Sequence, residues 1–159
     1  MYLEEYTPQH KEVVNNYYLT EEMNYYTSHP KDCLVKSPEN KSFHSVLAFS
    51  DQALVTFLVL DEGKDKMLYT NNKNTILLRS FSTDSRFLKK GHAKEALRIL
   101  PKFIQQNYPH IEEIVLAVNM KNTSAQNLYL KTGFIDKGTR VQGPLGELMV
   151  MRLTQKSLK

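Results

Sequence analysis

The stretch "RFLKKGHAKEALRIL", from Arg86 to Leu100, begins as a basic loop with one glycine and continues as an amphipathic pattern. The first turn of a helix leaves backbone N–H groups without partners, and the helix dipole adds partial positive charge there. Lys89, Lys90 and Gly91 stand at this point, where glycine lets a ligand approach the backbone closely. The stretch is therefore either a solvated basic turn or a binding site for an anion such as a phosphate.

Tyr129 is a second residue that could carry chemistry. It shares one face of a predicted helix with Ala125, Leu128 and Thr132, and this spacing alone favours a tyrosine in the core. At the wall of a binding site, the same hydroxyl could give a proton or a hydrogen bond to a leaving group. The surrounding sequence is needed to distinguish a core tyrosine from a catalytic one.

Two common phosphate-binding loops do not match the basic loop. A Walker A loop requires G-x-x-x-x-G-K-[ST], which "KKGHAKEA" does not satisfy. A dinucleotide fingerprint requires G-x-G-x-x-G after the first strand of a βαβ unit, whereas Gly91 stands alone here. An anion site at Gly91 would belong to neither class.

The histidines and the cysteine give little support for metal or thiol chemistry. His92 lies in the basic loop, but no second ligand stands at metal-binding spacing, and His29, His44 and His110 are scattered. We therefore expect no metal. The single cysteine, Cys33, excludes a disulfide within the chain and favours a packing role in a reducing compartment.

The composition predicts one packed domain that spans residues 1–159. Hydrophobic residues make up 41% of the 159 residues and charged residues 24%. The net charge of +4 is scattered and does not interleave with aromatic residues, so we expect no nucleic-acid binding. "MYLEEYTPQH" does not resemble a secretory signal, and no apolar run reaches the roughly 18 residues that span a bilayer. We expect a soluble cytoplasmic protein without a membrane partner.

Hydrophobic periodicity predicts the elements that must position these residues. Strands are expected at residues 2–7, as a hairpin within 44–63 whose turn is "SDQ", and at 75–83, 112–119, 134–141 and 146–153. Helices are expected within 10–26, after Gly91 with a bend caused by Pro101, and within 122–134. Residues 28–42, with their two prolines, are expected to be a loop. Thr123 and Gln126 have capping-box spacing, and Gly133 suits a left-handed C-cap.

Two stretches together resemble the GNAT superfamily of acyl-CoA-dependent N-acetyltransferases. They are "LLRSFSTDSRFLKKGHAKEAL" and, about thirty residues later, "LAVNMKNTSAQNLYLKTGF". The family's loop pattern, Gln or Arg, two residues, Gly, one residue, then Gly or Ala, falls on Leu88 to Ala93 and departs only at Leu88. The family's second motif is present at Asn122, Ala125, Leu128, Tyr129, Gly133 and Phe134. The resemblance implies an α/β fold with a mostly antiparallel sheet of about seven strands, flanked by helices and splayed at the fourth strand.

The resemblance also implies a site for acetyl-CoA as co-substrate. Main-chain N–H groups of the basic loop would hold the pyrophosphate, and the bulged fourth strand would hold the pantetheine arm as if it were an added strand. The coenzyme-binding residues implied in this way are Phe81, Ser82, Thr83, Lys89, Lys90, Gly91, His92, Ala93, Lys94 and Asn122. By the same resemblance Tyr129 is the catalytic residue, with its hydroxyl directed at the coenzyme sulfur. There it would act as the general acid on the thiolate that leaves when an amine attacks the thioester.

The attacking amine must first lose a proton. An amine with a pKa of about 10.4 is almost fully protonated near pH 7.4, which corresponds to roughly 4 kcal/mol. In some relatives a glutamate on the bulged strand takes this proton, but the matching place here is near Arg79 and Ser80, neither of which is a base. The remaining candidates are a water-relayed path and the carboxylates of Asp84, Glu21, Glu22 and Glu147, although a turn at the strand end is the simpler role for Asp84.

The acceptor side is less defined. The tail "VQGPLGELMVMRL" resembles that of diamine and polyamine acetyltransferases, which suggests a small cationic amine, with Glu21 and Glu22 as acidic wall residues. A peptide amine, an amino sugar or an antibiotic is also compatible with the fold. The resemblance suggests a homodimer as well. The alternative function is a catalytically silent acyl-CoA-binding module.

Overall fold

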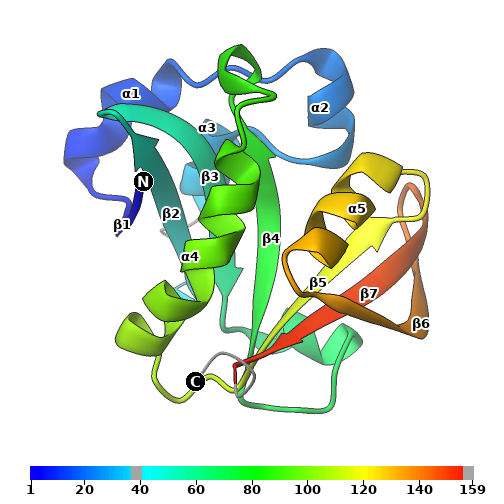
Figure 1. Ribbon diagram of the computed structural model, residues 1–159. Coiled ribbons are helices and arrows are strands. Elements are labelled where there is room, and N and C mark those ends of the chain that lie inside the picture. The colour runs from blue at the N-terminus through cyan, green and yellow to red at the C-terminus, as the bar shows by residue number, and fades with distance from the viewer. Residues whose placement is uncertain (37–40, 156–159) are drawn as a thin grey trace.

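The computed structural model describes residues 1–36 and 41–155, whose core is one twisted sheet of seven strands (Figure 1). The strand order is β1-β2-β3-β4-β5-β7-β6. Neighbouring strands are antiparallel except β4 and β5, which are parallel and joined through helix α4. The strands are β1 (Tyr2–Glu5), β2 (Phe43–Ser50), β3 (Ala53–Asp61), β4 (Thr75–Thr83), β5 (Glu113–Asn119), β6 (Ile135–Gly143) and β7 (Gly146–Thr154).

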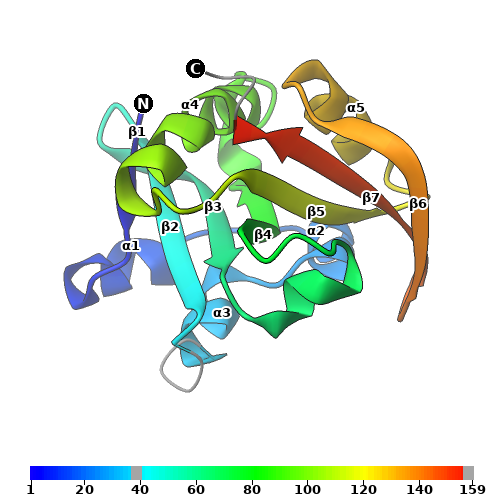
Figure 2. The same ribbon diagram turned by 90° about the horizontal axis from the view of Figure 1, so that it is seen from below.

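Helices cover both faces of the sheet. Helices α4 (His92–Asn107) and α5 (Thr123–Lys131) lie on one face, and α1 (Lys11–Asn15), α2 (Glu21–Tyr26) and α3 (Pro30–Lys36) lie on the other (Figure 2). Short 3₁₀ turns, η1 (Pro8–His10), η2 (Lys64–Leu68) and η3 (Ser85–Phe87), complete the order. None of the helices in the described part of the chain is long and apolar enough to cross a membrane.

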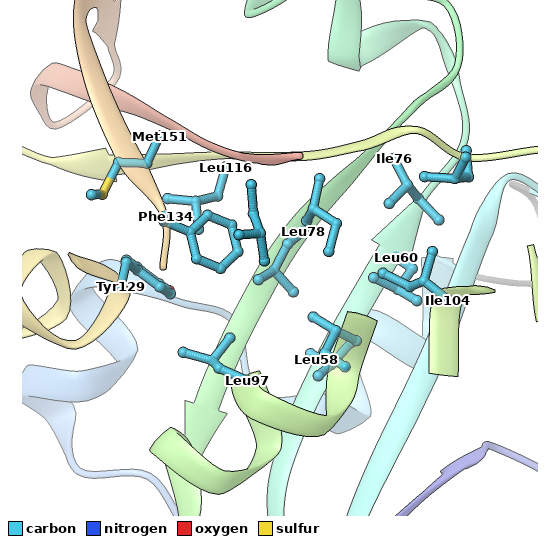
Figure 3. Packing of buried hydrophobic residues seen from close by; sticks show 14 of the residues in the cluster. Leu58, Leu60, Ile76, Leu78, Leu97, Ile104, Leu116, Tyr129, Phe134 and Met151 are labelled. Carbon is cyan, nitrogen blue, oxygen red and sulfur yellow. The ribbon is translucent and has the colours of Figure 1, made fainter. Parts of the chain in front are cut away.

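Each face has its own hydrophobic core. Under α4 and α5, buried side chains such as Leu97, Ile104 and Tyr129 pack against Leu78 and Leu116 of the sheet (Figure 3). On the other face, a second cluster joins helices α1 and α3 to β2 and β3; its buried members are Val14, Tyr17, Leu19, Cys33, Leu47, Phe49, Leu54, Phe57 and Val59. The two cores hold the sheet between two layers of helices, so packing on both faces fixes the positions of the strand ends.

Strand β4 contains a bulge and separates from β5 beyond its first residues. Ser80 and Phe81 together oppose one residue of β3, and Ser80 has a positive φ of 54°. The parallel pairing of β4 with β5 ends at Leu77 and Val115. The second half of β4 therefore keeps β3 as a partner on one side and has none on the other.

The predicted fold class and its strands are confirmed, including the splay at β4. The expected helices in residues 10–26 and 122–134 are also present. Helix α4 runs unbroken through Pro101, and the left-handed cap at Gly133 has a φ of 101°. Proline did not force a break in this helix because packing of its apolar face holds the turn on either side.

Two local predictions are wrong. Residues 30–36, expected within a loop, form α3, because Pro30 occupies the first helical turn, where a missing N–H costs nothing. The capping box is also absent, since Asn122 is the N-cap of α5 and accepts a hydrogen bond from the Ala125 N–H over 3.3 Å. The Gln126 amide instead donates to the carbonyl oxygens of Asn119 and Met120.

Candidate active site

A cleft of about 1090 Å³ lies where β4 and β5 separate. Its walls are the splayed strands, helices α2 and α5, the start of α4, and the turn between β6 and β7. Residues on the coenzyme face of the cleft, as the sequence predicts it, are Phe81, Ser82, Thr83, Leu88, Ala93, Asn122, Ala125, Leu128 and Tyr129. The structure thus brings together the two sequence motifs, which are separated by about thirty residues in the chain.

The free edge of β4 gives this cleft hydrogen-bonding groups from the backbone. Beyond Leu77 no strand in the described part of the chain pairs with β4 on its β5 side. Backbone N–H and C=O groups that lack a partner are costly unless something else satisfies them. An extended ligand with amide groups can take the place of the missing strand. The cleft therefore fits an arm of amide character along Phe81, Ser82 and Thr83.

The basic loop opens at one end of the same cleft. Leu88 and Ala93, which flank the loop, line the cleft, whereas Lys89, Lys90 and Gly91 are exposed beyond it. Gly91 is the N-cap of α4 with a φ of 80°, and Lys89 has a φ of 63°. No side chain caps this helix, so its first N–H groups remain available for an anion at the mouth.

His92 and Lys94 belong to the first turn of α4 and do not line the cleft. Both are half-buried. The His92 ring lies edge-on to Phe87, with 6.4 Å between ring centroids, and its Nδ1 is buried without a hydrogen-bond partner among the described residues. The part of these two residues that faces the predicted pyrophosphate site is therefore the backbone at the helix mouth, and their contact with the coenzyme stays a prediction.

The Tyr129 side chain is fixed between two aromatic rings on the cleft wall. Its ring centroid lies 6.1 Å from that of Phe81 and 5.7 Å from that of Phe134, and the side chain is 8% exposed (Figure 3). Burial raises the pKa of the Tyr129 hydroxyl far above its ordinary value. No hydrogen bond joins this hydroxyl to another described residue. It is therefore a protonated donor at neutral pH that packs in the core and also lines the cleft, while its catalytic role stays a prediction.

Beside the cleft lies a second cavity that shares Arg79 and Ser80 with it and adds the charged side chain of Asp65. This second cavity has a volume of about 350 Å³ and is also lined by Tyr26 of α2. Arg79 donates to the buried Asp61 over 2.9 Å and to the half-exposed Asp65 over 3.3 Å. The guanidinium charge is thus already balanced by Asp61, and Asp65 leaves an excess of negative charge in this second cavity.

The carboxylates proposed from the sequence as bases have different positions. Glu22 lines the cleft, while Glu21 and Glu147 do not. Asp84 is fully buried and accepts hydrogen bonds from the backbone and side chain of Arg86, so its role in a turn at the strand end is confirmed. Among the described residues, no group of three or more histidine, cysteine or acidic side chains is placed to hold a metal ion.

The acceptor-side wall contains residues, besides Glu22, that the sequence did not indicate. It includes Tyr26, Thr27 and Ser28 after α2, and Pro144 and Leu145 in the turn after β6. The residues near α2 show no clean hydrophobic period. Apart from the two glutamates, their only notable feature in the sequence is that they are rich in tyrosine. The turn is held over the cleft by a hydrogen bond of 3.0 Å from the Asn119 side chain to the Leu145 carbonyl oxygen.

Similar proteins have the same architecture. The structure matches aminoglycoside acetyltransferase AAC(6')-Ib in complex with coenzyme A and kanamycin, with a TM-score of 0.76 at 17% identity over 98% of this chain and 95% of that chain. It also matches spermidine N-acetyltransferase from Vibrio cholerae in complex with coenzyme A and spermine, with a TM-score of 0.72 at 15% identity over 98% and 95% of the two chains. At these identities the matches show a shared fold.

The sequence comparisons go further than the fold. A family model for the acetyltransferase (GNAT) family matches residues 3–134. The uncharacterized N-acetyltransferase YbbJ of Bacillus subtilis (strain 168) is 37% identical over 147 residues, which cover 92% of each chain. Together with the motifs and the splayed cleft, these matches show that the chain belongs to the GNAT family and is an acetyl-CoA-dependent N-acetyltransferase.

Proposed function

We propose that the chain acetylates a small-molecule amine that carries at least two positive charges. The observation behind this proposal is the excess of negative charge on the acceptor side, where Glu22 and Asp65 line the two cavities. Arg79, the cation beside them, is neutralised by the buried Asp61. A second ammonium group of the acceptor can therefore pair with these carboxylates while the first reaches the acetyl group.

In this proposal the coenzyme follows the chain of contacts that the cleft offers. Phe81, Ser82 and Thr83 hold the pantetheine arm through their backbone groups, and Asn122 borders the same arm. The N–H groups at the mouth of α4, around Gly91, hold the pyrophosphate, while the neighbouring lysines add positive charge. Leu88 in place of the family's Gln or Arg leaves this binding intact because the backbone makes the contacts.

Tyr129 acts as the general acid. Acetyl-CoA supplies the acetyl group as a thioester. Attack by the neutral amine on the carbonyl carbon forms the amide C–N bond and breaks the C–S bond, so that the coenzyme leaves as a thiolate and the nitrogen gives up its surplus proton through a water-relayed path. The Tyr129 hydroxyl, kept protonated by burial, gives this sulfur a proton or a hydrogen bond. A backbone N–H on the bulge at Ser80 and Phe81 stabilises the charge that develops on the acetyl oxygen.

Replacing Asp65 by asparagine tests the acceptor class. We expect the KM for 1,4-diaminobutane to rise about fivefold, because the half-exposed carboxylate loses its pairing with the second ammonium, which is worth about 1 kcal/mol at such a site. The KM for butylamine, which has one charge, should stay unchanged. A thiol-release assay with acetyl-CoA measures both.

The matched control is Asp136→Asn. Asp136 is also paired with an arginine, Arg140, at 2.9 Å, but it does not line either cavity. Both KM values should be unchanged in this variant. Equal effects of Asp65→Asn on the diamine and the monoamine would contradict recognition of a second charge. Binding of acetyl-CoA without turnover of diamines, aminoglycosides, lysine peptides or amino acids would instead favour the silent binding module.

A further inference from the structure

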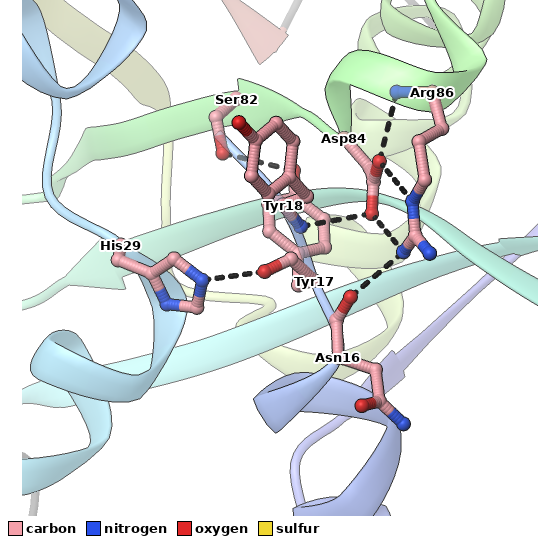
Figure 4. Close-up of polar contacts among 7 residues, drawn as sticks. All are labelled: Asn16, Tyr17, Tyr18, His29, Ser82, Asp84 and Arg86. Carbon is pink, nitrogen blue, oxygen red and sulfur yellow. Dashed lines mark hydrogen bonds and ion pairs between the residues drawn. The ribbon is translucent and has the colours of Figure 1, made fainter. Parts of the chain in front are cut away.

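The connection between α1 and α2 is fastened to the residues that follow β4 (Figure 4). Arg86 donates from Nη2 to the carbonyl oxygen of Asn16 over 2.7 Å. The Tyr18 N–H donates to Asp84 Oδ2 over 3.0 Å, and the Tyr18 carbonyl oxygen accepts from the Ser85 N–H over 2.9 Å. These contacts join segments that are more than sixty residues apart in the sequence.

Tyr17, between these two anchored residues, adds a contact to β4 itself. Its hydroxyl shares a hydrogen bond of 2.9 Å with the Ser82 hydroxyl, and its carbonyl oxygen accepts from His29 Nε2 over 2.6 Å (Figure 4). Tyr17 is 3% exposed, and burial raises the pKa of its hydroxyl, which therefore stays protonated. Ser82 lines the coenzyme face of the cleft, so this bond connects the segment directly to the cleft wall.

Asp84 is the centre of the network. Its carboxylate is fully buried and accepts from the Arg86 N–H, Nε and Nη2 and from the Tyr18 N–H, at 2.7 to 3.0 Å. Burial alone would raise the pKa of this carboxyl. The net pKa nevertheless lies below its usual range, because the carboxylate accepts hydrogen bonds from Arg86 and the Tyr18 N–H and lies beside the positive charge of Arg86. The network therefore stays charged and intact at neutral pH.

The network connects the two chain segments that lead to the α2 wall and to the α4 end of the cleft. On one side of it the chain continues from Tyr18 into α2, whose start provides Thr20 and Glu22 to the cleft wall. On the other side it continues from Arg86 to Leu88 and the mouth of α4. Neither Asp84 nor Arg86 lines the cleft itself.

We propose that Asp84 and Arg86 are positioning residues that set the place of the acceptor wall relative to the coenzyme strand. They act through Asn16 and Tyr18, which lead into α2, and hold Glu22 at a fixed distance from the bulge of β4. This rests on the proposed function only in that the α2 side receives the amine. Without the pair, the coenzyme site remains and the acceptor site loses its fixed wall.

Arg86→Ala is the sharpest test, because the Arg86 side chain is exposed and Asp84 keeps the backbone N–H donors of Arg86 and Tyr18 after its loss. Because the buried Asp84 loses its charge partner in this variant, its melting temperature should fall, and the assays are run well below it.

Of the three side-chain hydrogen bonds that this variant loses, the one to the Asn16 carbonyl oxygen joins the guanidinium to the segment before α2. We expect the KM for the amine to rise about tenfold, the effect of losing this one hydrogen bond from a charged group. The KM for acetyl-CoA should change less than about twofold, since Ser82 and Thr83 keep their pairing with β3 when Arg86 is lost. Arg86→Lys, which keeps the charge without the planar fork, should recover part of the loss.

Arg140→Ala is the matched control. It removes another arginine that is paired with an aspartate, at 2.9 Å, outside the cleft. Both KM values should stay at the wild-type level. The probe amine is whichever of spermidine, diamines, aminoglycosides, lysine peptides and amino acids the wild type acetylates fastest, so failure of the two-charge acceptor proposal would change the probe and not the test.

Hydrogen exchange locates the effect. In Arg86→Ala we expect faster exchange of the amides of α2 (Glu21–Tyr26), with unchanged protection in α4 and β5. Equal rises in the KM for the amine and for acetyl-CoA, or faster exchange throughout the sheet, would show a general structural role and overturn the proposal. Unchanged amine KM in Arg86→Ala would overturn it as well.

Discussion

Tyr129→Phe is expected to lower turnover about a hundredfold, which is within the range that one positioned proton donor contributes. The affinity for coenzyme A, measured by calorimetry, should stay the same, because the ring keeps its packing between Phe81 and Phe134. The change removes only the hydroxyl, which no other described residue binds. A loss confined to turnover therefore reports on the chemical step.

The pH dependence of the wild type follows from the same burial. The pKa of Tyr129 is raised by burial, and a group with a raised pKa stays protonated to higher pH than usual. The rate should rise with pH as the amine loses its proton, and it should not fall as the pH passes about 10, the ordinary tyrosine value. A fall below that pH would show that the acid is another group or that Tyr129 titrates normally.

Tyr108→Phe is the matched control for Tyr129→Phe. Tyr108 is also buried, at 7% exposure, but its hydroxyl bonds to Glu5, far from the cleft lining. Turnover should be unchanged in this variant. If Tyr129→Phe turned over as fast as the wild type, the role of Tyr129 as general acid would be wrong, and the residue would be part of the core alone.

Gly91→Asp is expected to weaken coenzyme A binding about a hundredfold, with a loss of stability limited to about 1–2 kcal/mol from the left-handed backbone at this position. An added Cβ would meet no atom within 4 Å, and aspartate both tolerates a left-handed conformation and is a preferred N-cap. Its carboxylate would, however, occupy the helix mouth where the pyrophosphate is proposed to bind. Repulsion and the loss of free N–H donors together are worth about 2–3 kcal/mol in a partly screened site.

Gly91→Asn separates charge from shape. Asparagine has the same size and also accepts the left-handed conformation, but it brings no negative charge. We expect a loss of affinity below about tenfold, and a small decrease in melting temperature that is similar in both variants because both place a Cβ at a φ of 80°. Similar affinities for coenzyme A in the wild type and both variants would favour the simpler interpretation, that the basic loop is a solvated turn.

The strands, and the residues of the two motifs that line the cleft, were predictable because their signals are local in the sequence. The strand at residues 75–83 shows dense β-branched and apolar residues, and the basic loop directly precedes an amphipathic helix. Tyr129 was identified by the motif around it, since helical spacing alone favours a core residue. The splay itself followed from the resemblance and had no signal in composition or period.

Apart from Glu22, the acceptor side of the cleft could not be predicted, because it depends on contacts between distant residues. The Arg79–Asp61 pair joins neighbouring strands, and the Arg86–Asn16 bond spans seventy residues. The positive φ of Ser80 also has no signature, because serine is not a typical left-handed residue. Pro30 misled the prediction of a loop, since a proline that starts a helix and one that interrupts it look alike in a single sequence.

Mapping backbone amide shifts by NMR during titration with coenzyme A tests the placement of the coenzyme most directly. We expect the largest shifts at residues 81–83, along the free edge of β4, and at the first N–H groups of α4 after Gly91. The amides of β1 and of the buried β2 should be unaffected, because these two strands lie at the edge of the sheet away from the splay, with β3 between them and β4. Shifts confined to other elements, or no binding, would contradict the cleft between β4 and β5 as the coenzyme site.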